Sequence, residues 1–331
     1  MPAVDQHISS NDERSIVVGV DGSEHSRLAL KWAADEAKRR DLWLRIMYAH
    51  VREPQFVPAW YSPESSDLSP GEAIIDEAVG LAATRHPSVI ARGEVVEWPA
   101  ALVLTSASRS AEMLVVGARG LGGFDELLLG SVSDQCVQYA HCPVVVVHSD
   151  SDDLPYRAVE PRIVVGIDGS LGSARALQWA LEEASIRGAS VEGVYAWQYP
   201  PVGSFIMGPT HGSKVVAHEV VDAATDHAER LAPDVPFKAV ACFNAAVPAL
   251  LDACEGADLL VVGSRGHGRF QNALLGSVAH QCARHAGCAV VVARPHTGET
   301  DTGTRARDDR RAERSTGGPQ PGAPSPTASG S

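Results

Sequence analysis

The chain has 331 residues, 44% of them hydrophobic and 21% charged, a composition typical of a soluble protein with about two domains. Its net charge of −13 argues against duplex nucleic acid or an anionic membrane as a partner, because both attract basic surfaces. The first residues lack the basic and apolar regions of a signal peptide, and no apolar run approaches the ~18 residues of a membrane span. We therefore expect a cytoplasmic protein that binds neither nucleic acid nor membrane, with its six cysteines as free thiols.

The first half of the chain alternates between short β-branched runs and segments with apolar residues at helical spacing. The runs predict strands over residues 15–20, 42–49, 89–97, 113–116 and 142–147. The helical patterns predict helices over residues 26–39, 72–85, 100–109 and 131–139. This half therefore has the element order βαβαβαβαβ.

The second half repeats the first. The segment from Ile16 to Ser23 returns from Ile163 to Ser170, and the Leu-Val-Val-Gly that ends at Gly117 returns at Gly263. A repeat of about 135 residues is a whole domain rather than a solenoid unit. We expect one domain at residues 14–148, a polar linker at 149–161 and a second domain at 162–294. The N-terminal residues 1–13 and the Pro-, Gly- and Ser-rich tail at 295–331 are predicted to be disordered.

Strands that are apolar throughout and alternate with amphipathic helices indicate a parallel sheet covered on both faces. The predicted fold class is therefore α/β, with two tandem doubly wound five-stranded parallel-sheet domains of Rossmann-like type. Such sheets bind ligands outside the carboxyl ends of their strands. The loops after the first and fourth strands of each repeat are the expected positions of a site.

The loop after the fourth strand has the pattern G-x2-G-x9-G-S in both repeats, at residues 117–131 and 263–277. Glycines let a ligand approach the backbone, and a helix that begins at Gly-Ser offers N–H groups to an anion. The pattern favours phosphate binding, although glycines that only shape a turn remain an alternative. It is neither a Walker A loop, which needs Lys-Ser/Thr after the last glycine, nor a dinucleotide fingerprint.

These residues, together with Val-Gly-Val/Ile-Asp-Gly-Ser at each first strand, make the chain resemble the universal stress protein family over about 280 residues. It is similar to the ATP-binding, tandem-domain members typical of mycobacteria and other actinobacteria. The resemblance implies an adenine nucleotide alpha hydrolase-like fold, ATP with a possible Mg²⁺ ion, and one site per repeat. It implies nucleotide contacts, by family analogy, from Gly19, Asp21, Ala49, Gly117, Gly120, Gly130, Ser131 and Val132, and from Gly166, Asp168, Ala196, Gly263, Gly266, Gly276, Ser277 and Val278.

Three functions remain open at this point. The first is a nucleotide-responsive regulator of stress adaptation or growth, acting on an unidentified protein partner. The second is a slow ATPase or nucleotidyl-transfer enzyme, although the chain lacks the usual Lys clamp and arginine finger of phosphoryl transfer. The third is an interaction module in which nucleotide is structural. The apolar last strands are expected to pair, which would join the repeats as an intramolecular pseudo-dimer, and a homodimer is a further possibility.

Single residues also leave alternatives open. Arg119 and Arg265 lie inside the glycine motif and could pair either with phosphate or with a local acid. His267 and Arg269 occur only in the second repeat, so the two sites could differ in phosphate affinity. Trp32 and Trp179 recur on the first helix of each repeat and are interpreted as core residues rather than ligand stackers.

Overall fold

The computed structural model describes residues 15–51, 69–121, 129–148, 160–198, 211–266 and 274–295, with only the backbone described for 211–213. The chain divides into one compact unit of residues 1–296 and a second unit of residues 297–331. All described elements lie in the first unit. The predicted disorder of the N-terminus and the tail, and almost all of the predicted linker, lie outside the described residues, as do His267 and Arg269.

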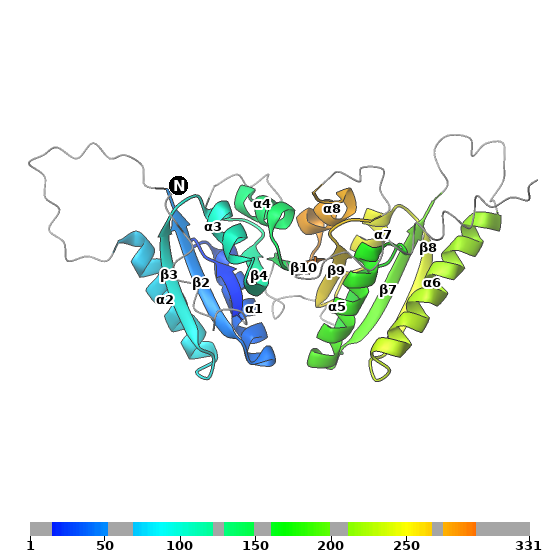
Figure 1. The fold of residues 1–331 in the computed structure, drawn as a ribbon, viewed down its shortest axis with the longest axis horizontal. Helices are drawn as coiled ribbons and strands as arrows, with labels where there is room; N and C mark the ends of the chain where they lie inside the picture. Colours follow the sequence, from blue (N-terminus) through cyan, green and yellow to red (C-terminus); the bar gives the residue numbers. More distant parts are fainter. Residues whose placement is uncertain are drawn as a thin grey trace, which may run out of the picture. The chain divides into compact units, whose positions relative to one another are not determined.

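The two repeats have the same element order, as the sequence predicts (Figure 1). The first consists of β1 (Ser15–Gly19), α1 (Glu24–Arg40), β2 (Trp43–His50), α2 (Pro70–Arg85), β3 (Ala91–Glu97), α3 (Ala100–Ala107), β4 (Ala111–Gly117), α4 (Ser131–Tyr139) and β5 (Val144–Val147). The second consists of β6 (Arg162–Gly166), α5 (Leu171–Arg187), β7 (Ser190–Trp197), α6 (His211–Leu231), β8 (Phe237–Phe243), α7 (Ala246–Ala253), β9 (Leu259–Gly263), α8 (Ser277–His285) and β10 (Ala289–Ala293).

Most elements of the first repeat begin or end one or two residues away from their expected bounds, and two of these differences have a clear local reason. Helix α1 begins earlier than predicted, at Glu24, because the Ser23 hydroxyl accepts a hydrogen bond from the Ser26 N–H and caps the helix. Strand β3 begins later, at Ala91, because the Val89 N–H donates to the His86 carbonyl in a turn. Neither difference moves a residue of the predicted site.

The strands form one sheet in the order β3-β2-β1-β4-β5-β10-β9-β6-β7-β8. All pairs within a repeat are parallel, and the last strands β5 and β10 pair antiparallel, with Val145 opposite Val291. The sheet is thus two parallel five-stranded halves joined into one, and the sequence-based expectation that the last strands pair is met. The order reverses beside β1 and β6, which are the switch points where such sheets bind ligands.

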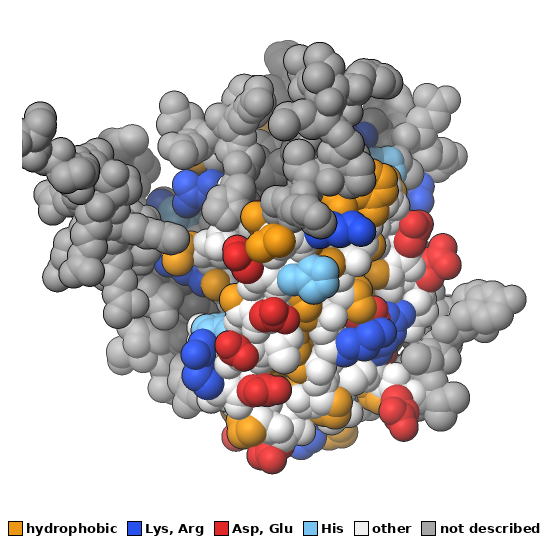
Figure 2. Space-filling model, turned by 90° about the vertical axis from the view of Figure 1, so that its right-hand side faces the viewer, with side chains coloured by type: hydrophobic (Ala, Val, Ile, Leu, Met, Phe, Trp, Pro, Cys, Tyr) orange, Lys and Arg blue, Asp and Glu red, His pale blue; other side chains and the backbone are white. Residues whose placement is uncertain are grey.

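Helices cover both faces of this sheet (Figure 1). One continuous apolar cluster lies under α1, α2, α5 and α6, and a second lies under α3, α4, α7 and α8. All six cysteines are free thiols, and five of them are buried in the fold. None of the described helices is long and apolar enough to cross a membrane. The edge of the second repeat displays acidic, basic and apolar side chains interspersed (Figure 2).

Helices α1 and α5 meet through a buried cluster of four charged side chains, two from each repeat. The Arg187 guanidinium donates to Glu36 at 2.7 Å, and Arg40 donates in the same way to Glu183. Both carboxylates are fully buried. Burial opposes ionisation of Glu36, but the guanidinium groups of Arg187 and Arg40 hold the pKa of its carboxyl below the ordinary value.

The two tryptophans of these helices belong to the same contact. The guanidinium of Arg187 lies 5.4 Å from the Trp32 ring centroid, and that of Arg40 lies 5.8 Å from the Trp179 ring. Each tryptophan therefore stacks against an arginine of the opposite repeat, an arrangement that adds cation–π attraction to the ion pairs. Trp32 is buried and Trp179 is half-buried, and neither lines the predicted site.

Candidate functional site

Each repeat has a pocket at the carboxyl ends of its first and fourth strands, of about 1050 Å³ in the first repeat and about 540 Å³ in the second. All predicted site residues line these two pockets. The first pocket is lined by Gly19, Asp21, Ala49, Gly117, Gly120, Gly130, Ser131 and Val132. The second is lined by Gly166, Asp168, Ala196, Gly263, Gly266, Gly276, Ser277 and Val278. In each repeat, the fold therefore brings residues about 100 positions apart in the sequence into one pocket.

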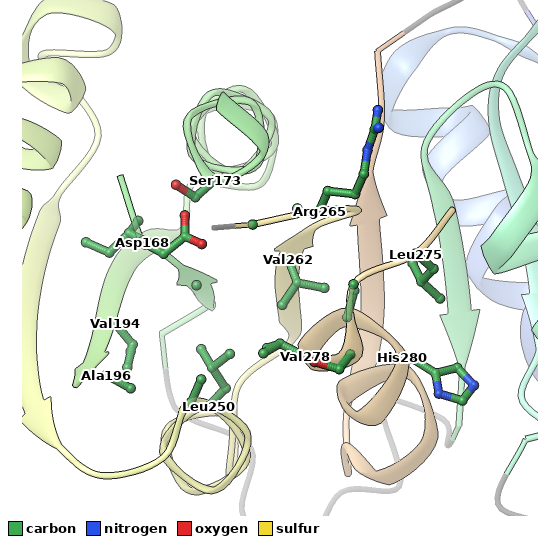
Figure 3. A pocket seen from close by; sticks show the side chains of 18 of the residues that line it. Asp168, Ser173, Val194, Ala196, Leu250, Val262, Arg265, Leu275, Val278 and His280 are labelled. Atoms are coloured by element: carbon green, nitrogen blue, oxygen red, sulfur yellow. The ribbon is translucent and has the colours of Figure 1, made fainter. Parts of the chain in front are cut away.

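The aspartate after each first strand organises the loops around the pocket. The two carboxylate oxygens of Asp21 accept hydrogen bonds from the Ser23 N–H at 2.9 Å and from the Leu121 N–H at 3.1 Å. Asp168 accepts in the same way from the Ser170 N–H at 2.9 Å, and Figure 3 shows its side chain at the edge of the pocket. In the first repeat, the carboxylate thus ties the turn after β1 to the glycine loop after β4.

Four of the motif glycines lie in close contact with other atoms of the protein. A Cβ on Gly117 would lie 2.6 Å from the His25 carbonyl oxygen, because the first turn of α1 runs directly over the end of β4. Gly263 meets the backbone of Gly172 at the same distance. A Cβ on Gly120 or Gly266 would lie 2.3 Å from the aspartate carboxylate. The backbone contacts require glycine at 117 and 263 without any ligand, whereas at 120 and 266 a larger residue would displace the aspartate side chain.

The last motif glycine of each repeat has no such explanation. Gly130 and Gly276 have φ values of −71° and −72°, which any residue adopts. A Cβ on either would meet its nearest neighbour at 3.5 or 3.4 Å, an ordinary contact. Each is the N-cap of the following helix, α4 or α8, and neither helix has a side-chain hydrogen bond at its cap. Both helix ends therefore present backbone N–H groups to the pocket beside a position kept free of a side chain.

The alanines near the ends of β2 and β7 direct their backbones toward the pockets. The Val20 N–H donates to the Met47 carbonyl, and Ile167 donates to Val194, so these carbonyls face the first strand of their repeat. Alternate residues of a parallel strand direct their N–H and C=O groups to the same side. Ala49 and Ala196 are two residues further on, where pairing with β1 and β6 has ended. Because of this alternation, the backbone N–H and C=O groups of Ala49 and Ala196 face the pocket, whereas those of the residues just before and after them face the other way.

The arginines inside the motif, Arg119 and Arg265, line the two pockets. Within the described part of the chain neither forms an ion pair, which removes support for the alternative of a local acidic partner. The first pocket also contains His25. Burial, and then the neighbouring Arg119 guanidinium, lower the pKa of His25, so its imidazole is neutral near pH 7.

Sequence reasoning missed several pocket residues. The first turn of α1 lines the first pocket with Glu24, His25 and Arg27. The sequence did not mark these residues as part of a site, because the second repeat has different residues at the equivalent positions. Gln138 and His280 line the second pocket, although Gln138 belongs to the first repeat. The bond between Ser133 Oγ and the Gly117 carbonyl, at 2.6 Å, fixes α4 to the end of β4. The sequence offered one signal for Ser133, namely its position two residues after the motif serine Ser131.

The comparisons with known proteins agree with the repeat structure. A model of the universal stress protein family matches residues 13–148 and 161–294. Universal stress protein Rv2623 of Mycobacterium tuberculosis is 32% identical over 304 residues, covering 86% of this chain and 98% of its own. Universal stress protein Rv2005c of the same organism is 36% identical over 296 residues, covering 85% and 97%. A universal stress protein structure from Archaeoglobus fulgidus, at 20% identity and a TM-score of 0.53, covers 87% and 99% and shares the fold.

Proposed function

The chain belongs to the universal stress protein family, and we propose that each repeat binds one adenine nucleotide, ATP by preference, and that the protein acts as a nucleotide-responsive regulator. The proposal extends the family membership to a ligand and to one site per repeat. Its partner would be a protein whose binding depends on nucleotide occupancy.

The observation that carries the proposal is the pair of glycines at the N-caps of α4 and α8. Neither backbone conformation nor packing requires glycine at 130 or 276, yet both repeats have it. A ligand that touches the helix end explains the absence of a side chain. The dipole of a helix favours an anion at its N-terminus, and the backbone N–H groups there lack a side-chain acceptor. Phosphate is the anion that best fits such a helix N-terminus, which we call the phosphate cradle: Gly130 and Ser131 in the first repeat, Gly276 and Ser277 in the second.

The remaining residues fit the rest of an adenine nucleotide. The backbone groups of Ala49 and Ala196 would hydrogen-bond adenine. The carboxylate of Asp21 has lone pairs left for ribose hydroxyls, and Asp168 is the equivalent residue of the second pocket. Ser131 and Ser277 are exposed at the helix ends and would donate to phosphate oxygens. Arg119 and Arg265 would add positive charge beside them. This local charge matters because a body with a net charge of −13 gives a polyanion no long-range attraction.

A divalent cation, where present, would reduce the charge of the phosphates. The described residues contain no group of three His, Cys, Asp or Glu side chains that could hold a metal ion. A Mg²⁺ ion would therefore be bound mainly through the phosphates, and the Ser131 and Ser277 hydroxyls are protein oxygens that could add a ligand.

The same contacts argue for binding rather than rapid hydrolysis. Both oxygens of Asp21 accept backbone N–H groups, so this carboxylate is engaged in holding the two loops of the pocket together. Nucleotide is also not needed to hold the repeats together. The β5–β10 pairing and the Glu36–Arg187 cluster lie outside both pockets. We therefore assign nucleotide a signalling role rather than a structural one.

The test replaces the glycines that folding does not need. Gly130→Val and Gly276→Val should fold normally, because a Cβ fits at both positions, and should fill the phosphate cradles. We expect the double variant to lose ATP binding in calorimetry, with a midpoint of thermal unfolding within about 4 °C of the parent, the shift typical of 1 kcal/mol or less. Each single variant should bind one nucleotide per chain instead of two.

The matched control is Gly80→Val, an exposed glycine of α2 that has open space around its Cβ and lies outside both pockets. It should retain both sites. The parent chain, purified natively and denatured in acid, should release adenine nucleotide detectable by mass spectrometry. Absence of released nucleotide, together with no heat of binding for ATP in the parent, would contradict the proposal.

A further inference from the structure

Helices α4 and α8 contact each other across the junction of the repeats. His280 Nε2 lies 2.8 Å from Asp134 Oδ1, and the two residues are 146 positions apart, so they are equivalent members of their repeats. An identical pair of domains would place two aspartates or two histidines here. The tandem chain instead pairs a carboxylate from the first repeat with an imidazole from the second, so the contact is asymmetric.

The ends of these helices are held in the same crossed manner. His148 Nε2 lies 2.9 Å from the Ala283 carbonyl oxygen of α8, and Arg294 donates to the equivalent Val137 carbonyl of α4. Each repeat therefore satisfies carbonyl groups at the C-terminal end of the helix whose N-terminus forms the other repeat's pocket. With the central contact between Asp134 and His280, the C-terminal half of α4 lies beside the pocket of the second repeat.

Gln138 is the residue of α4 that reaches this pocket. It lines the second pocket together with Ser277 and His280. Its Nε2 donates to Asp134 Oδ2 at 2.7 Å, while the other oxygen of Asp134 faces His280. One carboxylate thus holds two pocket-lining side chains, one from each repeat. The side-chain Oε1 of Gln138 and the second N–H of its amide make no hydrogen bond with a described residue, so they remain available to a ligand, whereas its backbone carbonyl accepts from Arg294.

The first pocket is built differently. The equivalent of Gln138 is Arg284, and none of the described residues that line the first pocket belongs to the second repeat. In Figure 3, His280 lies on the side of the second pocket away from Asp168, one turn along α8 from the cradle at Ser277. The second pocket therefore differs from the first in having a described lining residue, Gln138, from the other repeat. Gln138 and His280 lie at the end of the pocket where the phosphates are expected.

We propose that Gln138 is a ligand-binding residue of the second repeat's site, supplied across the junction by the first repeat. The inference rests on the proposed nucleotide binding and concerns the phosphate end of that ligand. The Gln138 amide donates to a phosphate oxygen, and Asp134 is the positioning residue that orients both the amide and His280. The second site is complete only in the tandem chain, whereas the first site is contained in its own repeat.

The experiment measures Gln138→Ala in two full-length backgrounds, each with one site blocked. With Gly130→Val blocking the first site, we expect the variant to weaken ATP binding at the second site about three- to tenfold in calorimetry, the loss of one hydrogen bond. With Gly276→Val blocking the second site, ATP binding at the first site should be unchanged. A merely structural effect would give the opposite result, because Gln138 lies on the helix that forms the first site's cradle.

Arg284→Ala is the matched control, since it truncates the equivalent position on α8. It should leave the first site's affinity for ATP unchanged, because Arg284 does not line that pocket. Unchanged affinity of the second site on Gln138→Ala, or an equal loss at both sites, would overturn the inference while leaving the proposed function standing. A chain that binds no nucleotide in either background would instead contradict the proposed function.

Discussion

The two pockets share the residues that face a phosphate end and differ in the residues around it. Both have a glycine at the helix N-cap, a serine at the first helical position, and an arginine two residues after the fourth strand. The first pocket adds charged side chains from the first turn of α1, among them Glu24 and Arg27. The second has no described residue of the equivalent turn before Ser173, and is lined instead by Gln138 and His280.

Gly172 gives a physical reason for part of this difference. A Cβ at this position would lie 2.0 Å from the Arg265 carbonyl oxygen, so the start of α5 lies directly against the loop after β9. The equivalent residue in the first repeat is His25, whose side chain lines the pocket. Both repeats thus have the same glycine N-cap, but the start of α5 narrows the second pocket on that side. We infer that the two sites differ in what they accept around the phosphates.

The largest expected effect comes from breaking the contact that both repeats share equally. Glu36→Ala should reduce the free energy of unfolding by about 3–5 kcal/mol, because it leaves the buried guanidinium groups of Arg187 and Arg40 with one carboxylate between them, that of Glu183. Glu183→Ala should have a similar cost, because Arg40 and Arg187 contact both carboxylates. Urea denaturation followed by circular dichroism measures both.

The control for this comparison is the double variant Glu36→Ala/Arg187→Ala, which removes a charge of each sign. Its cost should be well below the sum of the two single variants, because the excess buried charge that each single variant leaves is gone, and Arg40 and Glu183 remain as a pair. Additive costs would show that the four charges act independently, contrary to their arrangement. A cost for Glu36→Ala close to zero would show that this cluster does not hold the repeats together.

This cluster also shows where sequence reasoning ended. The strands, the helices and the gathering of the motif residues around two pockets follow from periodicity and from the duplicated glycine loops, which act within one repeat. The ion cluster could not be foreseen, because Glu36 and Arg40 are four residues apart on a helix and have the pattern of an exposed pair. Only the pairing of α1 with α5 buries them, and no local pattern encodes which helices meet across the junction.

The roles of the motif glycines could be predicted only in part, for a similar reason. The sequence places Gly117 and Gly130 in one pattern, but one avoids the protein's own backbone and the other has room for a side chain. That distinction depends on how closely α1 crosses β4, a distance set by tertiary packing. The same holds for Gln138, whose place in the second pocket depends on the crossing of α4 and α8.

A smaller effect would sharpen the comparison by making the first site resemble the second. Ser133→Ala removes the buried hydrogen bond to the Gly117 carbonyl and installs the residue that the second repeat has at Ala279. We expect a loss of about 0.5–1.5 kcal/mol in the free energy of unfolding, and a modest loss of ATP affinity at the first site alone. Thermal unfolding and calorimetry in the Gly276→Val background measure the two effects. An equal loss of ATP affinity at the second site, measured in the Gly130→Val background, would contradict this assignment.

The smallest expected effect concerns the residues that reach across to the helix C-termini, His148 in the first repeat and Arg294 in the second. Burial lowers the pKa of His148, whereas burial and Arg265 lower the pKa of Arg294 only to about 10. The unfolded chain therefore binds a proton at position 148 that the folded chain resists. Stability contributed by neutral His148 is present above the unfolded pKa of about 6.5 and is lost as the pH falls below it.

Replacing the histidine isolates this contribution from the other histidines of the chain. His148→Gln keeps a donor for the Ala283 carbonyl but cannot be protonated, so its free energy of unfolding should fall less between pH 8 and pH 6 than that of the parent. His285→Gln, at an exposed position of α8, should change with pH as the parent does. Arg294 stays charged throughout this range, so the pH dependence belongs to the first repeat's contact only. An identical pH dependence in His148→Gln and the parent would show that the two crossed contacts respond to protons alike.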